Sequence, residues 1–339
     1  MVNNIASILS SLRALLWWNH LAPPVLAVFY FFLWKNDLVF VSHLAHLALF
    51  MTSFAGSAAF GYWVNDWMDI EPDRLAGKPN AAAKWSSRQR VAITLVLLAI
   101  GWLPWVWLPF NFRILGLLLA LYTALVIYAV TPFRFKDRAI LGIFCDLLYG
   151  HLLPVFIAVA AFSALFGGAT LNSRLLWLIA LILALKGMRN ILEHQIKDRK
   201  NDALAGMNTF VRQIGALRSG NIMSYVVVPL ELALLAVLSF SLGQGVFISF
   251  ALFCLAYWFL LYTWGCLKGS PREWLYRSWY IANDYYESWL PLTFLALACI
   301  QQPINWLLLL AHLLIFPGSF LLPVRILKQI QYVWSEWTN

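Results

Sequence analysis

Charged residues are scarce in this sequence. Lys, Arg, Asp and Glu make up 12% of the 339 residues, whereas about a quarter of an ordinary soluble domain is charged. So little polar surface excludes a soluble protein built from long helices, because it could not cover them. The four cysteines show no metal-ligand spacing, so they predict no thiolate metal site. Because no Gly/Ser linker or low-complexity tract is present, we expect one domain over residues 1–339.

Apolar runs fill the chain instead. Hydrophobic residues make up 62% of the sequence, and its 18 Trp and 24 Phe suit aromatic belts at two membrane interfaces. A helix of about 20 apolar residues crosses the hydrocarbon core of a bilayer. The sequence therefore predicts an all-α, polytopic membrane helix bundle with ten spans, near residues 13–34, 43–64, 91–109, 112–130, 139–163, 173–193, 221–241, 244–266, 286–301 and 304–324.

Most lysines and arginines fall in alternate loops of this topology. The positive-inside rule then places the loops at 65–90 and 190–218 on the cytoplasmic side of an inner, cytoplasmic-type membrane. The net charge of +9 reflects this topology and an attraction to anionic lipid head groups or substrates. We therefore expect contact with membrane lipids and no nucleic-acid partner.

An acidic cluster follows the second span, in "GYWVNDWMDIEPDRLAGKPN" (61–80). At about 100° per residue, four oxygen-bearing side chains share one face of a helix, namely those of Asn65, Asp66, Asp69 and Asp73. Glu71 points to the opposite side. Pro72 should end or kink the helix at this point.

A second cluster, "NILEHQIKDRKNDALAGMNTF" (190–210), follows the sixth span, and its Asp198 and Asp202 share a face with His194. Mg²⁺ is usually held by a few carboxylates together with substrate phosphates. Two such clusters with lysines and arginines between them predict a site for a magnesium diphosphate. The alternative is a pair of solvated acidic helix ends that pair only with neighbouring lysines.

These motifs carry a family resemblance. "NDWMDIEPD" and "DRKND" resemble the two Asp-rich motifs of the UbiA superfamily of intramembrane prenyltransferases. "YAVTPFRFKDRAILG" (128–142) and "PREWLYRSWYIANDYYESWLP" (271–291) resemble two further segments of that family, so the similarity runs from about residue 15 to 301. The resemblance implies a ring of nine helices around a lipid-open cavity, to which this sequence adds a C-terminal helix.

The resemblance also implies roles for individual residues. The implied Mg²⁺ ligands are Asn65, Asp69, Asp73, Asp198 and Asp202. The implied diphosphate-binding cations are Lys78, Arg134, Lys136 and Lys197. Asp66 would ligate the metal or orient its neighbours, and Lys197 joins it as a candidate for catalysis. Asp146 is costly in lipid and should face the cavity, where it either handles a proton of the acceptor or hydrogen-bonds a neighbouring helix.

Two departures from the family pattern bear on the acceptor. Ile191 occupies a position that is acidic in many relatives, where Asn190 or Glu193 could compensate. The first span reads "WWNHLAPP" (17–24), where many aromatic-acid prenyltransferases have an arginine. An acceptor region of Asn19, His20 and His194 therefore favours a neutral aromatic or lipid-like acceptor over a carboxylated one.

The predicted function is Mg²⁺-dependent transfer of an isoprenyl group from a prenyl diphosphate to a small acceptor. The alternative within the same fold is a terpene cyclase that ionises the diphosphate without an acceptor. A phosphoribosyl transfer to polyprenyl phosphate is less favoured. A transporter is least favoured, because transporter carboxylates lie near the bilayer midplane, whereas these lie at a helix mouth.

Overall fold

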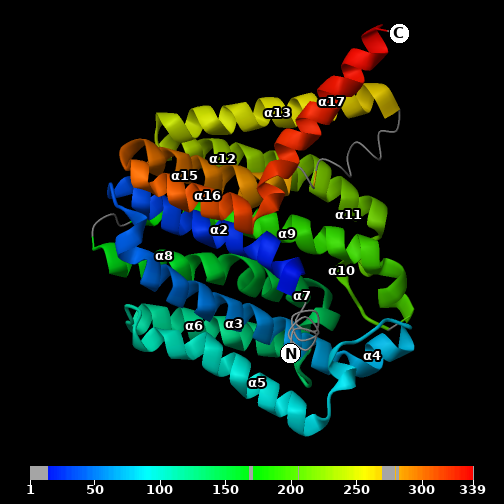
Figure 1. Cartoon of the computed structure of the whole chain (residues 1–339). Helices are drawn as coiled ribbons and strands as arrows, with labels where there is room; N and C mark the ends of the chain where they lie inside the picture. Colours follow the sequence, from blue (N-terminus) through cyan, green and yellow to red (C-terminus); the bar gives the residue numbers. More distant parts are fainter. Residues whose placement is uncertain (1–13, 168–170, 205, 269–278, 280–281, 339) are drawn as a thin grey trace. The chain divides into compact units, whose positions relative to one another are not determined.

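The computed structural model describes residues 14–167, 171–204, 206–268, 279 and 282–338. Every regular element within these ranges is helical (Figure 1), which confirms the all-α prediction. The α-helices are α2 (Ala14–Lys35), α3 (Leu44–Met68), α4 (Ile70–Leu75), α5 (Ser87–Trp102), α6 (Phe112–Ala129), α7 (Ala139–Asp146), α8 (Leu153–Phe166), α9 (Ser173–Leu204), α10 (Phe210–Ile214), α11 (Ala216–Ile222), α12 (Val228–Leu242), α13 (Gln244–Lys268), α15 (Leu290–Gln301), α16 (Trp306–Ile315) and α17 (Leu321–Thr338). Part of the predicted segment 271–291 lies outside the described residues.

Seven helical segments among the described residues are long and apolar enough to cross a membrane. They are Phe40–Met68, Ser87–Val106, Phe112–Ala129, Ala139–Phe166, Ser173–Leu204, Ala216–Leu242 and Gln244–Thr263. Pro303–Ile315 and Pro317–Lys328 make an eighth if this bent pair is one span. The predicted number of helices, a ring of nine with an added tenth, is therefore not confirmed.

The tenth predicted span, 304–324, is wrong as a single straight helix. Its two halves meet at an angle of 92° after Ile315. Pro317 lacks the N–H that would continue the helix, and its ring crowds the carbonyl four residues earlier. Hydrophobicity alone could not show this bend, because both halves are apolar.

Three π-helical segments share one sequence cause. They are Leu147–Leu152, Met223–Val227 and Tyr285–Trp289. Each is followed two residues later by a proline, namely Pro154, Pro229 and Pro291. A proline cannot hydrogen-bond the carbonyl four residues before it, and that carbonyl falls inside the π-helical segment in all three cases. Such widened turns are frequent at functional sites, and the first of them begins directly after Asp146.

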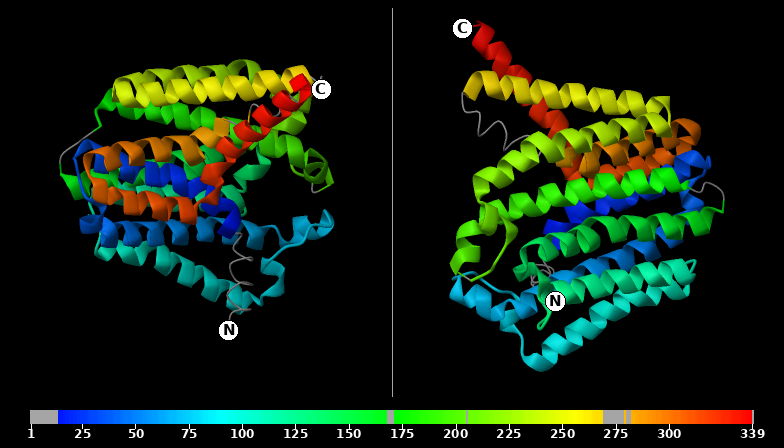
Figure 2. Two further views of the ribbon diagram at one scale, coloured as in Figure 1. Left: turned by 45° about the horizontal axis from the view of Figure 1, so that its top comes forward. Right: turned by 180° about the vertical axis from the view of Figure 1, so that it is seen from behind.

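The chain divides into two compact units, each made of segments far apart in sequence. The first unit comprises Met1–Leu21, Val41–Gly168 and Gly187–Asn221, and the second comprises Ala22–Phe40, Ala169–Lys186 and Ile222–Asn339. In the first unit, α3 packs against α5 and α6, and α6 packs against α8 (Figure 2). In the second unit, α12 pairs with α13 and α15 with α16. The single domain stays a prediction, and all predicted site residues belong to the first unit.

Candidate active site

The first acidic motif lies at a break between two helices. α3 ends at Met68, Asp69 stands between the helices, and α4 runs through Pro72 to Leu75. The interruption therefore lies three residues before the proline, because Pro72 has no N–H for the carbonyl of Met68. Arg134 Nη1 donates a hydrogen bond to that carbonyl at 3.2 Å. The break thus frees a backbone acceptor for an arginine from another loop.

The ammonium group of Lys136 lies between Asn65 and Asp69. Its Nζ donates to Asn65 Oδ1 at 2.8 Å and to Asp69 Oδ1 at 2.5 Å. The Lys136 side chain is only 4% exposed, and this burial lowers the pKa of Lys136, although the Asp69 carboxylate opposes the shift. Two side-chain oxygens of the first motif therefore converge on one cation.

Arg134 completes this ion-pair group. Its Nη2 donates to Asp69 Oδ1 at 2.9 Å and its Nε to Asp137 Oδ2 at 2.6 Å. Burial alone would lower the pKa of Arg134, but Asp137 and Asp69 outweigh it and raise the pKa. Arg134 and Ala139 adopt left-handed φ values of +37° and +33°, which costs free energy in residues other than glycine. The loop is therefore held against its own backbone preference at the point where it supplies two cations.

The remaining acidic side chains of this motif lie in different environments. Asp73 Oδ2 accepts a hydrogen bond from Asn80 Nδ2 at 2.8 Å, and the same nitrogen donates to the backbone oxygen of Asp66. Asp66 is 1% exposed within α3. Glu71 is 61% exposed and pairs with Arg74, which lowers the pKa of Glu71 through a hydrogen bond. Glu71 thus points to solvent, on the side expected from the helical spacing.

The second motif lies on the last turns of α9. This helix extends to Leu204, eleven residues beyond the predicted span end at 193. Asp198 Oδ2 accepts a hydrogen bond from Lys78 Nζ at 3.2 Å, and Asp202 Oδ2 accepts one from the Thr209 hydroxyl at 3.4 Å. The backbone N–H of Lys78 donates to the carbonyl of Asp73 at 2.8 Å. Lys78 therefore links the two Asp-rich motifs, which the sequence separates by more than 100 residues.

Lys197 differs from the other predicted phosphate-binding cations. Its Nζ pairs with Glu193 Oε1 at 2.7 Å within α9. Of the two residues that could compensate for Ile191, Glu193 is engaged in this pair, while Asn190 and Ile191 line the cavity described below. Asn190 Oδ1 also accepts a hydrogen bond from Arg189 at 3.2 Å.

The side-chain oxygen atoms of the first motif provide part of the ligand set that a hard divalent cation needs. Asn65 and Asp69 present amide and carboxylate oxygens to one point, which the Lys136 ammonium fills. Among the described residues, no group of three or more His, Cys, Asp or Glu side chains could hold a metal ion. The chain therefore offers an open donor set, in which these residues would hold Mg²⁺ together with oxygen atoms of the diphosphate and water.

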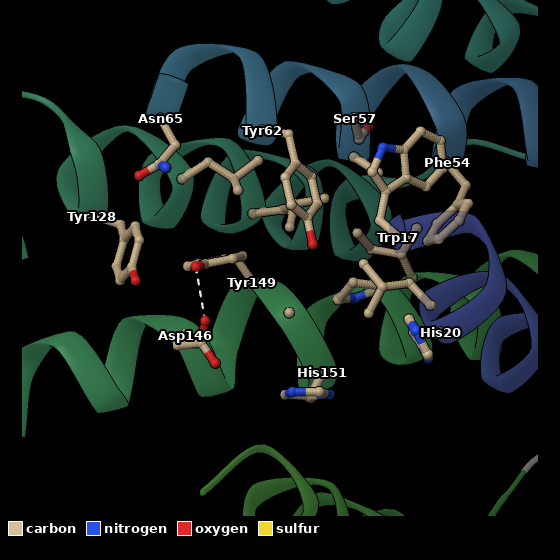
Figure 3. Close-up of a pocket in the computed structure, with 18 of the residues that line it drawn as sticks. Trp17, His20, Phe54, Ser57, Tyr62, Asn65, Tyr128, Asp146, Tyr149 and His151 are labelled. Carbon is tan, nitrogen blue, oxygen red and sulfur yellow. Dashed lines mark hydrogen bonds between the residues drawn. The ribbon is translucent and has the colours of Figure 1, made fainter. Parts of the chain in front are cut away.

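A cavity of about 450 Å³ opens beside this ion-pair group and shares Asn65 with it (Figure 3). Its walls come from α2, α3, α6, the α7–α8 segment and α9, and from Trp105. Aromatic and aliphatic groups form most of the lining, including Trp17, Phe50, Phe54, Trp105, Leu118, Leu121, Leu125 and Ile157. Its polar lining residues are His20, Ser53, Ser57, Tyr62, Asn65, Tyr128, Asp146, Tyr149, His151, Asn190 and His194. Within the part of the chain that the structure describes, no lysine or arginine belongs to the lining.

Asp146 belongs to this lining. Its hydrogen-bond partner, Tyr149, was not predicted from the sequence. Tyr149 donates its hydroxyl hydrogen bond to Asp146 Oδ1 at 2.8 Å (Figure 3). The Tyr149 ring lies edge-on to Tyr128 with centroids 5.0 Å apart. The three-residue spacing of Asp146 and Tyr149 places both on one helix face, and this spacing could have indicated the pair.

The predicted acceptor region is only partly assembled in the cavity. His20 and His194 line it, while Asn19, the neighbour of His20, is absent from the lining. His194 Nε2 also lies 3.8 Å from Asp198 Oδ2. His194 thus connects the cavity with the second Asp-rich motif.

The sequence matches the model of the UbiA prenyltransferase family over residues 21–283, which is more than half of its length. The chain belongs to the UbiA prenyltransferase family. This confirms the resemblance, and together with the apolar helices it identifies an integral membrane protein. No curated protein matches the sequence.

Several solved structures share the fold. A UbiA homologue from Archaeoglobus fulgidus, bound to GPP and Mg²⁺, is 19% identical with a TM-score of 0.60, over 85% of this chain and 99% of that chain. A structure concerned with digeranylgeranylglyceryl phosphate synthase is 17% identical with a TM-score of 0.59, over 87% of this chain and 99% of its own. The apo UbiA homologue from Aeropyrum pernix K1 is 19% identical with a TM-score of 0.53, over 83% of this chain and 98% of that one. The predicted Mg²⁺ and prenyl diphosphate agree with the ligands of the first of these proteins.

Proposed function

We propose that this protein is an intramembrane prenyltransferase that uses a prenyl diphosphate and Mg²⁺ to alkylate a small neutral acceptor. The observation that carries the proposal is the convergence of Asn65, which lines the cavity, and Asp69 on one cation. A diphosphate held at this point would place its prenyl chain along the apolar lining. The family membership and the GPP- and Mg²⁺-bound structure of a relative support it.

In this proposal, some residues of the site bind the metal and others bind the phosphates. The oxygens of Asn65, Asp69, Asp73, Asp198 and Asp202 would hold Mg²⁺, with Asp66 buried behind the first motif. When bound, Mg²⁺ neutralises the diphosphate and so favours its departure. Lys78, Arg134 and Lys136 would turn their N–H donors to the phosphate oxygens and stabilise the charge that develops on them. Lys197, which pairs with Glu193, is the weakest candidate of this set.

A terpene cyclase is the second candidate, because cyclisation starts from the same ionisation. The polar lining of the cavity favours transfer over cyclisation. Hydroxyl, imidazole and carboxylate groups such as Ser57, His20 and Asp146 would intercept a free carbocation. The same groups can instead orient the hydroxyl of an acceptor.

The test compares three acidic residues, two from the first motif and one from the second, in purified, reconstituted protein. With geranyl diphosphate and Mg²⁺, Asp69→Asn and Asp198→Asn should each lower diphosphate release by at least about 100-fold. Glu71→Gln is the matched control and should keep wild-type release, because Glu71 faces solvent. Equal loss in Glu71→Gln and Asp69→Asn would contradict the assignment. Release that needs an added acceptor supports transfer, whereas cyclic products made without one identify a cyclase.

A further inference from the structure

Asp146 has an unusual position for a carboxyl group in an apolar helix. It ends α7, directly before the π-helical segment Leu147–Leu152, and it lines the cavity. Among the described residues, its carboxyl group accepts one hydrogen bond, from the Tyr149 hydroxyl to Oδ1. The described residues that line the cavity beside it include no lysine or arginine. Asp146 is half-buried, and a carboxyl group in such apolar surroundings is costly, which favours a function for it.

The position of Asp146 along the cavity suggests that function. In Figure 3, Asn65 and Tyr128 lie at one end of the cavity, and Trp17, Phe54 and His20 lie at the other. Asp146 and Tyr149 lie next to the Asn65 end. Asn65 belongs to the diphosphate site of the proposed function, so an acceptor that meets C1 of the prenyl group would contact Asp146 rather than the aromatic end.

We propose that Asp146 is the catalytic base that takes the hydroxyl proton of a neutral acceptor, with Tyr149 holding the carboxylate in place. This inference rests on the proposed function. The O–H bond of the acceptor breaks, and its proton goes to Asp146 Oδ2. The electron pair of the acceptor oxygen forms the new bond to C1. The C1–O bond has by then broken by ionisation, and its electron pair has left with the diphosphate.

The same geometry defines the acceptor class. An anionic acceptor would meet the Asp146 carboxylate and no compensating lysine or arginine in the cavity lining. A phenol or another hydroxyl compound without charge would donate a hydrogen bond to Asp146 and present its apolar part to the aromatic lining. The cavity therefore selects neutral hydroxyl acceptors by charge.

Two probes that differ in charge test this selection. Reconstituted protein with geranyl diphosphate and Mg²⁺ is supplied with 4-hydroxybenzoate or with its neutral methyl ester, and prenylated product and diphosphate are both measured. The methyl ester should be prenylated with a kcat/KM at least about tenfold higher than the acid. Preference for the acid, or no transfer to the ester, would overturn the inference.

Variants then separate catalysis from folding. Asp146→Asn should lower transfer to the ester by about 100-fold or more, the scale of general-base catalysis, while diphosphate release persists. Asp146→Glu should restore part of the transfer. Glu231→Gln is the matched control, because Glu231 is 1% exposed, accepts a tyrosine hydroxyl hydrogen bond at 2.8 Å from Tyr286 and does not line the cavity. It should keep wild-type transfer.

The outcomes distinguish the two proposals. Normal transfer in Asp146→Asn would overturn the role of Asp146 and leave the proposed function intact. Equal loss of transfer in Glu231→Gln and Asp146→Asn would show a structural role only. No Mg²⁺-dependent diphosphate release by the wild-type protein would instead contradict the proposed function itself.

Discussion

Replacing Lys136 by methionine should tighten Mg²⁺ binding while it weakens catalysis. The Lys136 ammonium occupies the point where Asn65 and Asp69 converge. A metal ion that binds there without substrate must first break both hydrogen bonds. The methionine variant has no ammonium to displace, and its apolar side chain fills similar space.

The magnitude follows from those two contacts. A hydrogen bond to a charged group contributes about 1.5–3 kcal/mol, so displacing the ammonium costs about 3 kcal/mol or more. Part of this cost remains in the variant, because Arg134 still holds Asp69 at 2.9 Å. Since about 1.4 kcal/mol corresponds to a factor of ten, the Kd for Mg²⁺ should fall by about 10- to 100-fold. Diphosphate release should fall by at least about tenfold, because one phosphate-binding cation is lost.

The assay is a Mg²⁺ titration of substrate-free protein followed by isothermal calorimetry. Lys84→Met is the matched control, because Lys84 is exposed in the following loop, and it should leave both Kd and turnover unchanged. A thermal unfolding scan shows whether Lys136→Met is folded. An unchanged or weaker Mg²⁺ affinity in folded Lys136→Met would refute the assignment of this point as the metal position.

The other predictions concern the link between the motifs, the packing of the loop and the topology. Lys78→Met should raise KM for the prenyl diphosphate about tenfold with little change in Tm, since a part-exposed ion pair contributes at most about 1 kcal/mol; an unchanged KM would contradict its phosphate role. Gly142→Ala should lower turnover about tenfold, because its Cβ would lie 3.2 Å from Lys136 Cα, whereas a Cβ at Gly116 meets nothing within 4 Å and Gly116→Ala should be neutral. Ser87→Cys, in a chain without its four cysteines, should resist an impermeant maleimide added outside the cell. Labelling there would reverse the predicted orientation.

The helix positions could largely be predicted, because a span needs only a long apolar run. The end of α9 could not be found in this way, since its last turns are polar. Those turns nevertheless contain good helix formers such as Lys, Arg and Ala, and this signal could have indicated the continuation to Leu204. The bend after Ile315 has a different cause, which is the proline at position 317. An average of hydropathy along the chain does not indicate it.

The ion pairs of the site could not be predicted from the sequence, for another reason. Spacing along a helix relates residues a few positions apart, and it correctly turned Glu71 away from the other acidic groups. Lys136 meets Asp69 from 67 residues away, and Lys78 meets Asp198 from 120 residues away. Such pairs depend on how helices pack, and the family resemblance supplied the motifs without their pairing.

In the proposed reaction, the charged groups that pair with one another in the substrate-free site would exchange their partners for those of the substrate. Asp69 pairs with Lys136 and Arg134, and Asp198 pairs with Lys78. The Lys136 side chain is buried, and a buried charge that loses its partners is strongly destabilising, so this ammonium group can leave Asp69 only if it gains a new partner. A magnesium diphosphate brings both kinds of partner, since the metal can take the carboxylates while the phosphate oxygens take the ammonium and guanidinium groups. Among the described residues, the cavity lining includes no lysine or arginine, and the proposed proton transfer from the acceptor would neutralise the Asp146 carboxylate. In the proposed mechanism, ionisation would take place at the Asp-rich motifs and proton transfer inside the cavity.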